Sequence, residues 1–131
     1  MESNPSVANR NTSANMMRCK FYVCPICGNI IHALGDAAIN CCGIALSALK
    51  AEEIDSAHEF LIENVEDEHF VHVNHDMTKT HYISFLAYIT SDRLQMVKLY
   101  PEGNAETRLQ LRGHGWLYLY CNQHGLMKQK V

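Results

Sequence analysis

The sequence lacks any apolar run near the roughly 20 residues that a membrane-spanning helix requires. Residues 1–15 are mostly polar and do not show a charged stretch followed by an apolar one, the pattern of a secretory signal. We therefore expect a cytoplasmic protein that does not associate with membranes, in a compartment where thiols stay reduced.

Basic residues are also scarce. Eleven Lys and Arg against 14 Asp and Glu give a formal net charge of −3, so the chain has no broad positive field to hold phosphates. Nucleic acid is therefore not expected as a partner. The hydrophobic content of 47% is ordinary for a globular chain. A length of 131 residues suits one domain or two small ones.

Cysteine and histidine, by contrast, are abundant, with six Cys and eight His in this short chain. Five of the Cys lie within residues 19–50, among apolar runs too short to fold by burial alone. We expect residues 19–50 to form a small domain stapled by a metal ion. Residues 1–18 have no periodicity and are expected to be a disordered tail.

Four of these cysteines form a metal-binding pattern. Cys24 and Cys27 belong to a Cys-x-x-Cys turn, and Cys41 and Cys42 are adjacent and precede Gly43. Four thiolates without a His suit one tetrahedral zinc or iron ion. The spacing alone leaves a purely structural zinc ribbon equally open, but zinc ribbons usually combine two Cys-x-x-Cys turns rather than an adjacent pair.

From His58 onward, short apolar or alternating stretches are separated by turn signals. Strands are expected at residues 59–65, 68–73, 81–90, 94–100, 107–111 and 116–121. In the last of these, Leu117, Leu119 and Cys121 share one face. Six or seven strands in about 75 residues predict an all-β fold, an immunoglobulin-like antiparallel β-sandwich over residues 55–131. A charged linker at residues 50–56 would join it to the small domain, and no helix is expected.

Five further metal-ligand side chains lie at the ends of these expected strands. His75 and His81 flank a loop that enters the longest strand, and Cys121 and His124 form a Cys-x-x-His turn just after the last one. His58 opens the first strand and can join them. Because loops at one edge of a sandwich can converge, these residues predict a second metal site.

The remaining Cys and His have simpler interpretations. A lone His on a strand is usually satisfied locally or exposed to solvent, and this is our interpretation of His69, His72 and His114. His32 is interpreted as structural. Cys19 is expected to be a free thiol, because the set of four cysteines is complete without it.

In this order, the two constellations resemble the desulfoferrodoxin family. Residues 20–46, with Cys24-Pro-Ile-Cys27-Gly and Cys41-Cys42-Gly, resemble a desulforedoxin domain, in which four cysteines hold one iron. Residues 55–127 resemble a superoxide reductase domain, also called neelaredoxin. That pattern has a His at the first strand, His-Pro-Met and His-Tyr-Ile segments, and Cys-Asn-x-His-Gly near the C-terminus.

The resemblance implies two mononuclear iron sites. The first, a tetracysteine iron site, would serve electron transfer or structure and would use Cys24, Cys27, Cys41 and Cys42. The second, an iron with four histidines, one cysteine and an open sixth position, would use His58, His75, His81, His124 and Cys121. The resemblance further implies superoxide reductase activity, the one-electron reduction of superoxide to hydrogen peroxide at the ferrous second site. A small donor such as rubredoxin and a homodimer are also implied.

The chain departs from the family pattern near the second site. Family members commonly carry Glu-Lys before the first His, where the Lys attracts superoxide, whereas this chain has Ser56-Ala57. Asp76 stands where Pro is usual and adds negative charge. Lys79, in the same loop, is therefore our candidate for the missing positive charge and is included among the catalytic residues.

Two functions of other classes stay open at this point. The sequence Cys121-x-x-His124-x-x-Met127 also resembles the copper loop of cupredoxins, which would make the chain an electron-transfer protein of copper or non-catalytic iron. That loop leaves His75, His81 and the four-cysteine pattern unexplained. A zinc-stapled binding module without redox activity is the other alternative, and it predicts a colourless protein.

Overall fold

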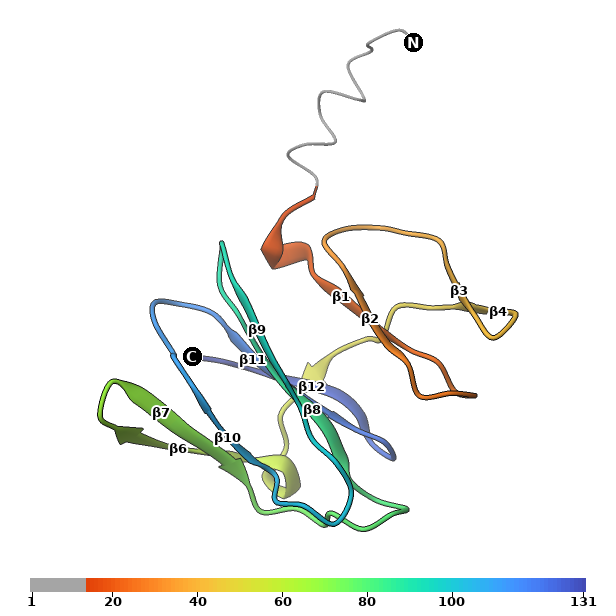
Figure 1. Cartoon of the computed structure of the whole chain (residues 1–131). Helices are drawn as coiled ribbons and strands as arrows, with labels where there is room; N and C mark the ends of the chain where they lie inside the picture. Colours follow the sequence, from red (N-terminus) through yellow and green to blue (C-terminus); the bar gives the residue numbers. More distant parts are fainter. Residues whose placement is uncertain (1–13) are drawn as a thin grey trace, which may run out of the picture. The chain divides into compact units, whose positions relative to one another are not determined.

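The computed structural model describes residues 14–131 (Figure 1). Most of the tail expected at residues 1–18 therefore lies outside the described residues. Its described end forms a 3-10 turn, η1 (Met16–Arg18), in which the Asn15 side chain accepts a hydrogen bond from the Met17 N–H at 3.0 Å. The described chain divides into two compact units, with the boundary between Leu49 and Lys50.

The N-terminal unit consists of two small hairpins. Strand β1 (Lys20–Val23) pairs antiparallel with β2 (Ile30–Ala33), and β3 (Ile39–Cys41) pairs antiparallel with β4 (Ile44–Leu46). Its fully buried side chains include Phe21, Tyr22 and Cys24. Because so small a core contributes little stabilisation, a unit of this size generally needs a metal or disulfide staple.

The Cys-Cys-Gly sequence forms the tight turn of the second hairpin. Cys41 pairs with Ile44, which leaves Cys42 and Gly43 as a two-residue loop. Both loop residues have positive φ, 54° at Cys42 and 75° at Gly43. Two successive positive φ angles are the requirement of a type I′ turn, and Gly meets it without steric cost. The turn thereby brings two neighbouring cysteines to the tip of one hairpin.

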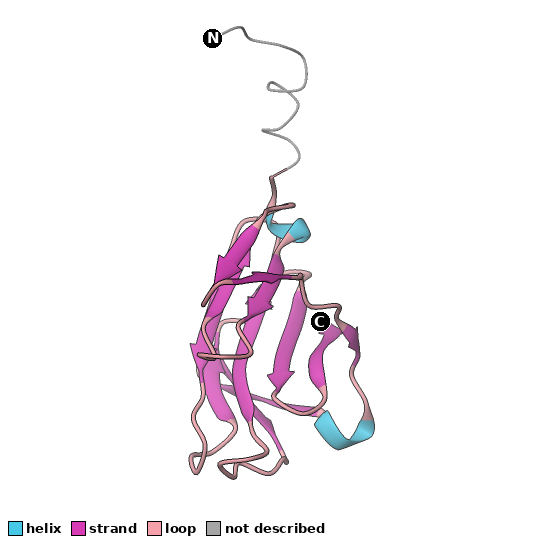
Figure 2. Cartoon of the chain, turned by 90° about the vertical axis from the view of Figure 1, so that its right-hand side faces the viewer, coloured by secondary structure: helices cyan, strands magenta, loops and turns pink. Residues whose placement is uncertain are grey.

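The C-terminal unit is a two-sheet β-sandwich (Figures 1 and 2). The three-stranded sheet has the order β10 (Glu106–Leu109), β7 (Glu68–Val73), β6 (Phe60–Val65). The five-stranded sheet has the order β5 (Glu52–Glu53), β12 (Gly125–Lys130), β11 (Trp116–Cys121), β8 (Ile83–Ile89), β9 (Leu94–Lys98). All neighbours pair antiparallel except β5 and β12, which are parallel. The expected all-β class is confirmed.

The core between the two sheets fixes the face on which Cys121 lies. Side chains from both sheets build this core, among them Phe60, Val71, Ile83, Leu86, Tyr88, Leu109, Leu117, Leu119, Cys121 and Met127. In β11, every second residue is buried, and Leu117, Leu119 and Cys121 have no exposed surface. The expectation that the thiol shares the leucine face is therefore correct. Among residues 14–131, no helix is long and apolar enough to cross a bilayer.

Several element bounds differ from the sequence-based expectation. Strand β12 was missed, because Gly-Leu-Met-Lys-Gln-Lys lacks the β-branched and aromatic residues that indicate strands. Part of the expected linker forms β5, which pairs with β12. His58 does not open a strand but ends a second 3-10 turn, η2 (Ser56–His58). His81 likewise lies before β8, which begins at Ile83.

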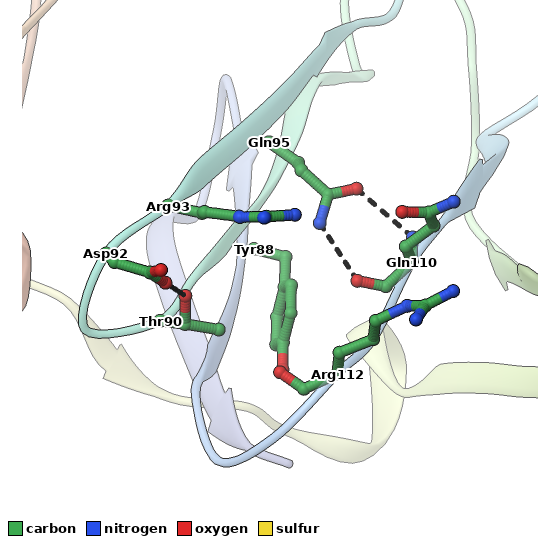
Figure 3. A pocket seen from close by; sticks show the side chains of 7 residues that line it. All are labelled: Tyr88, Thr90, Asp92, Arg93, Gln95, Gln110 and Arg112. Atoms are coloured by element: carbon green, nitrogen blue, oxygen red, sulfur yellow. Dashed lines mark hydrogen bonds between the residues drawn. The ribbon is translucent and has the colours of Figure 1, made fainter.

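A polar pocket of about 450 Å³ lies at one end of the sandwich, by the β8–β9 turn (Figure 3). The Gln95 side chain bridges to the backbone N–H and C=O of Gln110, which links the edge strand β9 to the segment after β10. The buried Tyr88 hydroxyl lies 2.9 Å from the Gly113 carbonyl oxygen. These hydrogen bonds give the polar side chains partners within the protein. We therefore interpret the pocket as a result of how the edge of the sandwich closes and not as a binding site.

Gly115 provides a test of this closure. A Cβ at this position would meet the Ile89 carbonyl oxygen and would lie 2.9 Å from a Tyr88 ring carbon. Both neighbours are buried, so neither can yield easily. We expect Gly115→Ala to lower the free energy of unfolding of the C-terminal unit by about 1–3 kcal/mol or more, measured by urea denaturation. Gly113→Ala, which meets no atom within 4 Å but has φ of 75°, serves as the comparison for backbone strain alone.

Candidate metal centres

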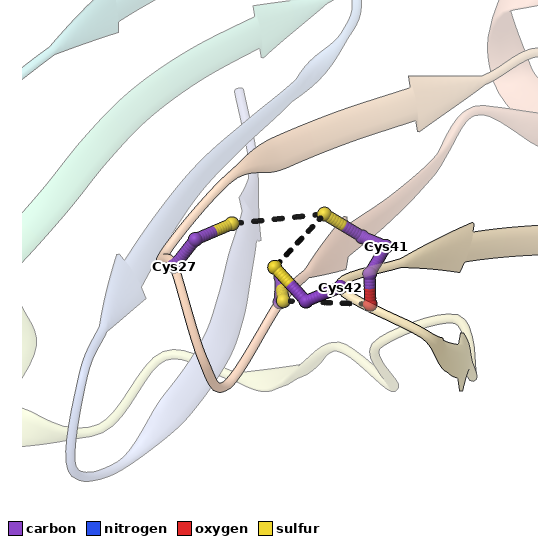
Figure 4. Close-up of side chains that lie close together, drawn as sticks. Cys27, Cys41 and Cys42 are labelled. Carbon is purple, nitrogen blue, oxygen red and sulfur yellow. Dashed lines mark hydrogen bonds between the residues drawn. The ribbon is translucent and has the colours of Figure 1, made fainter.

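The four cysteines of the N-terminal unit lie together at the tips of its two hairpins. Figure 4 shows Cys27, Cys41 and Cys42 of this cluster. The four sulfur atoms all lie within 4.8 Å of one another. The Cys27 and Cys41 sulfurs are 3.6 Å apart, and those of Cys41 and Cys42 are 4.0 Å apart. Metal–sulfur bonds of about 2.3 Å place the corners of a tetrahedron about 3.8 Å apart. The spacing therefore fits one four-coordinate metal ion.

The backbone around Cys24 prepares this site for thiolates. The Gly28 N–H donates to the Cys24 carbonyl oxygen at 2.9 Å, which closes the turn. A backbone N–H at Cys27 directed at the Cys24 sulfur is the main cause that lowers the pKa of the Cys24 thiol to about 7. Hydrogen bonding to Cys27 and the other nearby sulfurs raises the pKa of Cys42 to about 12. Only a bound cation would let all four ionise together.

Five ligand-type side chains converge in the C-terminal unit, and each comes from the end of an element. His58 ends η2, His75 follows β7, and His81 precedes β8. Cys121 ends β11, and His124 immediately precedes β12. The predicted convergence of loops at one sandwich edge is thus found in the structure.

The four imidazoles form a closed ring. Neighbouring ring centroids are separated by 4.7 Å from His58 to His75, 4.5 Å from His75 to His81, 5.1 Å from His81 to His124 and 5.0 Å from His124 to His58. Each ring therefore has two neighbours at similar distances, as in a square. Four imidazoles grouped in this way can surround one ion.

The Cys121 thiol lies against this ring. Its sulfur is 3.6 Å from Nε2 of His75 and 3.3 Å from Nδ1 of His124. For a sulfur perpendicular to a nitrogen plane, bonds of about 2.3 and 2.1 Å give an N···S distance of about 3.1 Å. The observed distances are only slightly wider. His58, His75, Cys121 and His124 form the tightest set, with their ligand atoms within 4.8 Å of one another.

Buried nitrogen atoms without partners support a metal at the centre of the ring. Within residues 14–131, the buried side-chain nitrogen and oxygen atoms without a hydrogen-bond partner are Nε2 of His58 and Nε2 of His81. A buried polar atom without a partner is costly and indicates a missing ligand or ion. Since both rings belong to the square, their free nitrogens fit metal ligation, and His81 joins the set on this evidence.

Oxygen atoms lie near the other ring nitrogen of three of the four imidazoles. Nδ1 of His58 lies 2.6 Å from the Asp55 carboxylate, and Nδ1 of His75 lies 2.6 Å from the Asp76 carbonyl oxygen. Nδ1 of His81 lies 3.6 Å from the Asp76 carboxylate. Burial is the main cause that lowers the pKa of His75, and the hydrogen bond with His58 lowers the pKa of Asp55. The lowered pKa of His75 favours a neutral imidazole, the form that binds metal.

Asn122 links the two loops of this site. Its side-chain oxygen accepts from the Tyr82 N–H at 2.9 Å, and its amide nitrogen donates to the Thr80 carbonyl at 3.0 Å. The His81 N–H donates to the Thr78 hydroxyl at 3.0 Å. Our sequence analysis missed these residues and Asp55. The Asp-x-x-His spacing before His58 was a usable signal for Asp55, whereas the contacts of Asn122 span 40 or more positions and had none.

One side of the group of four imidazoles opens into a pocket of about 460 Å³. Besides the four His, Ala57, Asn74 and Asp76 line it. Cys121 is fully buried and is not among the residues that line this pocket. Lys79 does not line it either: its Nζ lies 3.6 Å from the Glu102 carboxylate, and its side chain is 80% exposed.

The remaining Cys and His lie outside both clusters. Nδ1 of His69 accepts the Leu111 N–H at 3.2 Å, and the His72 ring lies 5.3 Å from the Phe70 ring. His32 and His114 are exposed, so no core role is seen for His32. Cys19 is half-buried, which raises its pKa. No disulfide joins any of the six cysteines, all of which lie within residues 14–131.

Comparison with known proteins gives relatives of one kind. A desulfoferrodoxin of Syntrophotalea carbinolica is 30% identical over 118 residues, which cover 83% of this chain and 94% of that protein. One of Desulfarculus baarsii is 28% identical over 120 residues, 85% of this chain and 95% of that protein. A match to a desulfoferrodoxin of Clostridium acetobutylicum, 36% identical over 59 residues, covers 47% of that protein. No family model matches the chain.

A solved structure supports the fold. The superoxide reductase from Treponema pallidum superposes with a TM-score of 0.72 and 22% identity, covering 85% of this chain and 97% of that one. At this level of sequence identity, the match shows that the two proteins share a fold. The match to the Syntrophotalea protein extends over nearly the full length of that relative. The structure contains a four-cysteine cluster and a cluster of His58, His75, His124 and Cys121 with the His81 imidazole beside it, each suited to iron. The chain belongs to the desulfoferrodoxin family.

Proposed function

We propose that the chain is a superoxide reductase that converts superoxide to hydrogen peroxide at an iron held by His58, His75, His81, His124 and Cys121. The observation that carries this proposal is the square of four imidazoles, with a buried thiol against it and a solvent-accessible pocket at its open face. Superoxide reductases are among the structural neighbours, and desulfoferrodoxins are among the relatives.

Each part of the site has a defined role in this reaction. A ferrous ion held by these residues would supply the electron for a small anion that enters the pocket. The Cys121 sulfur, buried at the end of β11 and outside the pocket lining, would donate electron density to such an ion. The four imidazoles leave that pocket free for the substrate. Superoxide takes up one electron and two protons to give hydrogen peroxide, so no dioxygen is released.

The first centre fits a supporting role. Its four sulfurs suit a single iron, which would serve electron transfer or stabilise the N-terminal unit. We further propose a small reducing iron protein such as rubredoxin as the electron donor, a homodimer as the assembly and the cytoplasm as the compartment. Reduced thiols at all six cysteines are consistent with that compartment.

The cupredoxin-like alternative is less well supported by the site. A blue-copper site uses two His, one Cys and a weak axial Met. Here the site offers four imidazoles besides the thiol, and Met127 belongs to the hydrophobic core of the sandwich. The zinc-module alternative is distinguished by colour, since a ferric tetrathiolate centre absorbs visible light and a zinc centre does not.

The first test combines metal content, reaction and one substitution. The protein should bind two irons per chain and form one hydrogen peroxide per superoxide consumed when a reductant is supplied. Cys121→Ser removes the sulfur ligand and should lower the rate by at least about 100-fold, with loss of the thiolate-to-iron absorption of the second centre. Cys19→Ser is the matched control, since Cys19 lies outside both clusters. Release of dioxygen, or retained absorption in Cys121→Ser, would contradict the proposal.

The second test concerns the first centre. Cys41→Ser should release or alter its metal and destabilise the N-terminal unit, because that unit has few fully buried side chains. Superoxide consumption with a chemical reductant should persist at the second centre. Metal analysis and the two visible absorption bands, followed during thermal unfolding, measure both effects. Simultaneous loss of both irons would show that the two centres are not independent.

The third test addresses attraction of the substrate anion, for which we propose Lys79. Ala57 lines the pocket, so Ala57→Lys should place a charge at the open face and raise the superoxide binding rate by ~10-fold, with a steeper salt dependence. Lys79→Ala should slow the reaction by a smaller factor, because the Glu102 carboxylate offsets the charge of Lys79. Pulse-radiolysis rates across salt concentrations measure both. Identical rates in Lys79→Ala and wild type would remove Lys79 from the reaction.

A further inference from the structure

Two carboxylates lie next to the candidate iron ligands. Asp55 contacts Nδ1 of His58 at 2.6 Å. Asp76 reaches two ligands at once: its carbonyl oxygen is 2.6 Å from Nδ1 of His75, and its carboxylate is 3.6 Å from Nδ1 of His81. Three of the four imidazoles are therefore oriented by these two residues.

From these contacts, and on the basis of the proposed function, we infer that Asp55 and Asp76 are positioning residues that set the reduction potential of the second iron. They act through the imidazoles of His58 and His81 and favour the ferric state. Neither residue belongs to the predicted ligand set, and Asp76 occupies a position where the family usually has Pro. Proline would retain a carbonyl oxygen but cannot supply the carboxylate.

The chemistry follows from which nitrogen faces the ring centre. Nε2 of His58 and Nε2 of His81 are the buried nitrogens without partners among residues 14–131, so Nδ1 must carry the proton in each ring when the metal is bound. A carboxylate that accepts this proton, or lies beside it, makes the imidazole a stronger electron donor. Stronger donation stabilises the higher charge of ferric iron more than that of ferrous iron. Each carboxylate should therefore lower the reduction potential.

The surroundings of the two residues argue against a purely structural role. Their side chains are largely exposed, 52% for Asp55 and 73% for Asp76, so neither contributes to the core. Asp55 is the N-cap residue of η2, which its backbone carbonyl closes at 3.2 Å from the His58 nitrogen, and the N–H groups of Ala57 and His58 also help to lower the pKa of its carboxyl. Asn caps a helix as well as Asp does, so Asp55→Asn keeps this role. Among the described residues, each of these carboxylates has one side chain within ion-pair distance. That side chain is His58 for Asp55 and His81 for Asp76. Substitution should consequently leave the fold intact.

The Asp76 carboxylate also has an unfavourable effect on the binding of an anionic substrate. Asp76 lines the pocket that receives an anion, where its negative charge opposes superoxide. A residue that slows encounter but strengthens the ligands shifts the centre toward a more strongly reducing iron. The same carboxylate should thus act in opposite directions on the binding rate and on the driving force for electron transfer.

The test uses full-length, iron-loaded protein and three variants. Asp55→Asn and Asp76→Asn retain size while removing charge, and Asp92→Asn is the matched control. The Asp92 carboxylate accepts the Thr90 hydroxyl at 3.1 Å beyond the far end of β8, about 20 Å along the strand from the site. We expect the midpoint potential of the second iron to rise in both single variants. In the double variant the ratio of ferric to ferrous affinity should fall at least about tenfold, which is about 59 mV for a one-electron couple.

A second measurement covers variants that retain iron poorly. In full-length protein loaded with diamagnetic Zn²⁺, the Nδ1 protons of His58 and His81 should exchange slowly in wild type and Asp92→Asn, and faster in the matching Asn variants. If the double variant has the potential and proton exchange of Asp92→Asn, the inference is overturned. Failure of wild type to reduce superoxide would reject the proposed function instead, since both measurements report on the bound metal and not on turnover.

Discussion

The C-terminal unit brings several metal-ligand atoms close together, although without a bound ion they would repel one another or lack hydrogen-bond partners. Most of its fold holds these atoms in place. Nε2 of His58 and Nε2 of His81 are buried without hydrogen-bond partners, and the Cys121 sulfur lies close to the imidazoles of His75 and His124. Such a set is costly without a cation. The sandwich offsets this cost through its core and through Asn122, which fastens the two ligand-bearing loops. In the N-terminal unit, two short turns bring the four cysteine sulfurs together.

Local signals in the sequence were sufficient for the fold class, the four-cysteine pattern and the face of Cys121, whereas the grouping of His58, His75, His81, His124 and Cys121 from distant loops rested on the resemblance of their motifs to a known family. Alternation places Cys121 with Leu117 and Leu119, and close spacing pairs Cys24 with Cys27. Strand β12 was not recognisable, since its Lys and Gln residues are ordinary in a helix or loop and pairing with β11 makes it a strand.

What escaped prediction was set by contacts between distant segments or by unusual backbone conformation. His58 lies in a 3-10 turn and not in a strand, a difference that short apolar windows do not reveal. The role of Asn122 depends on Thr80 and Tyr82, at least 40 positions earlier. Lys79 was chosen for its charge and nearness in sequence and stays a proposal; the sequence did not reveal its ion pair with Glu102 or its place outside the pocket lining.

The attachment of Cys121 to β11 has a mechanical consequence. Its neighbours in the sheet are Gly125 of β12 and Ile83 of β8, and strand β8 is buried along its whole length. The sulfur is therefore anchored to the least deformable part of the C-terminal unit, whereas the imidazoles of His75 and His81 come from a loop. A metal ion held there would therefore have one ligand fixed by the sheet and two ligands on a loop that can adjust.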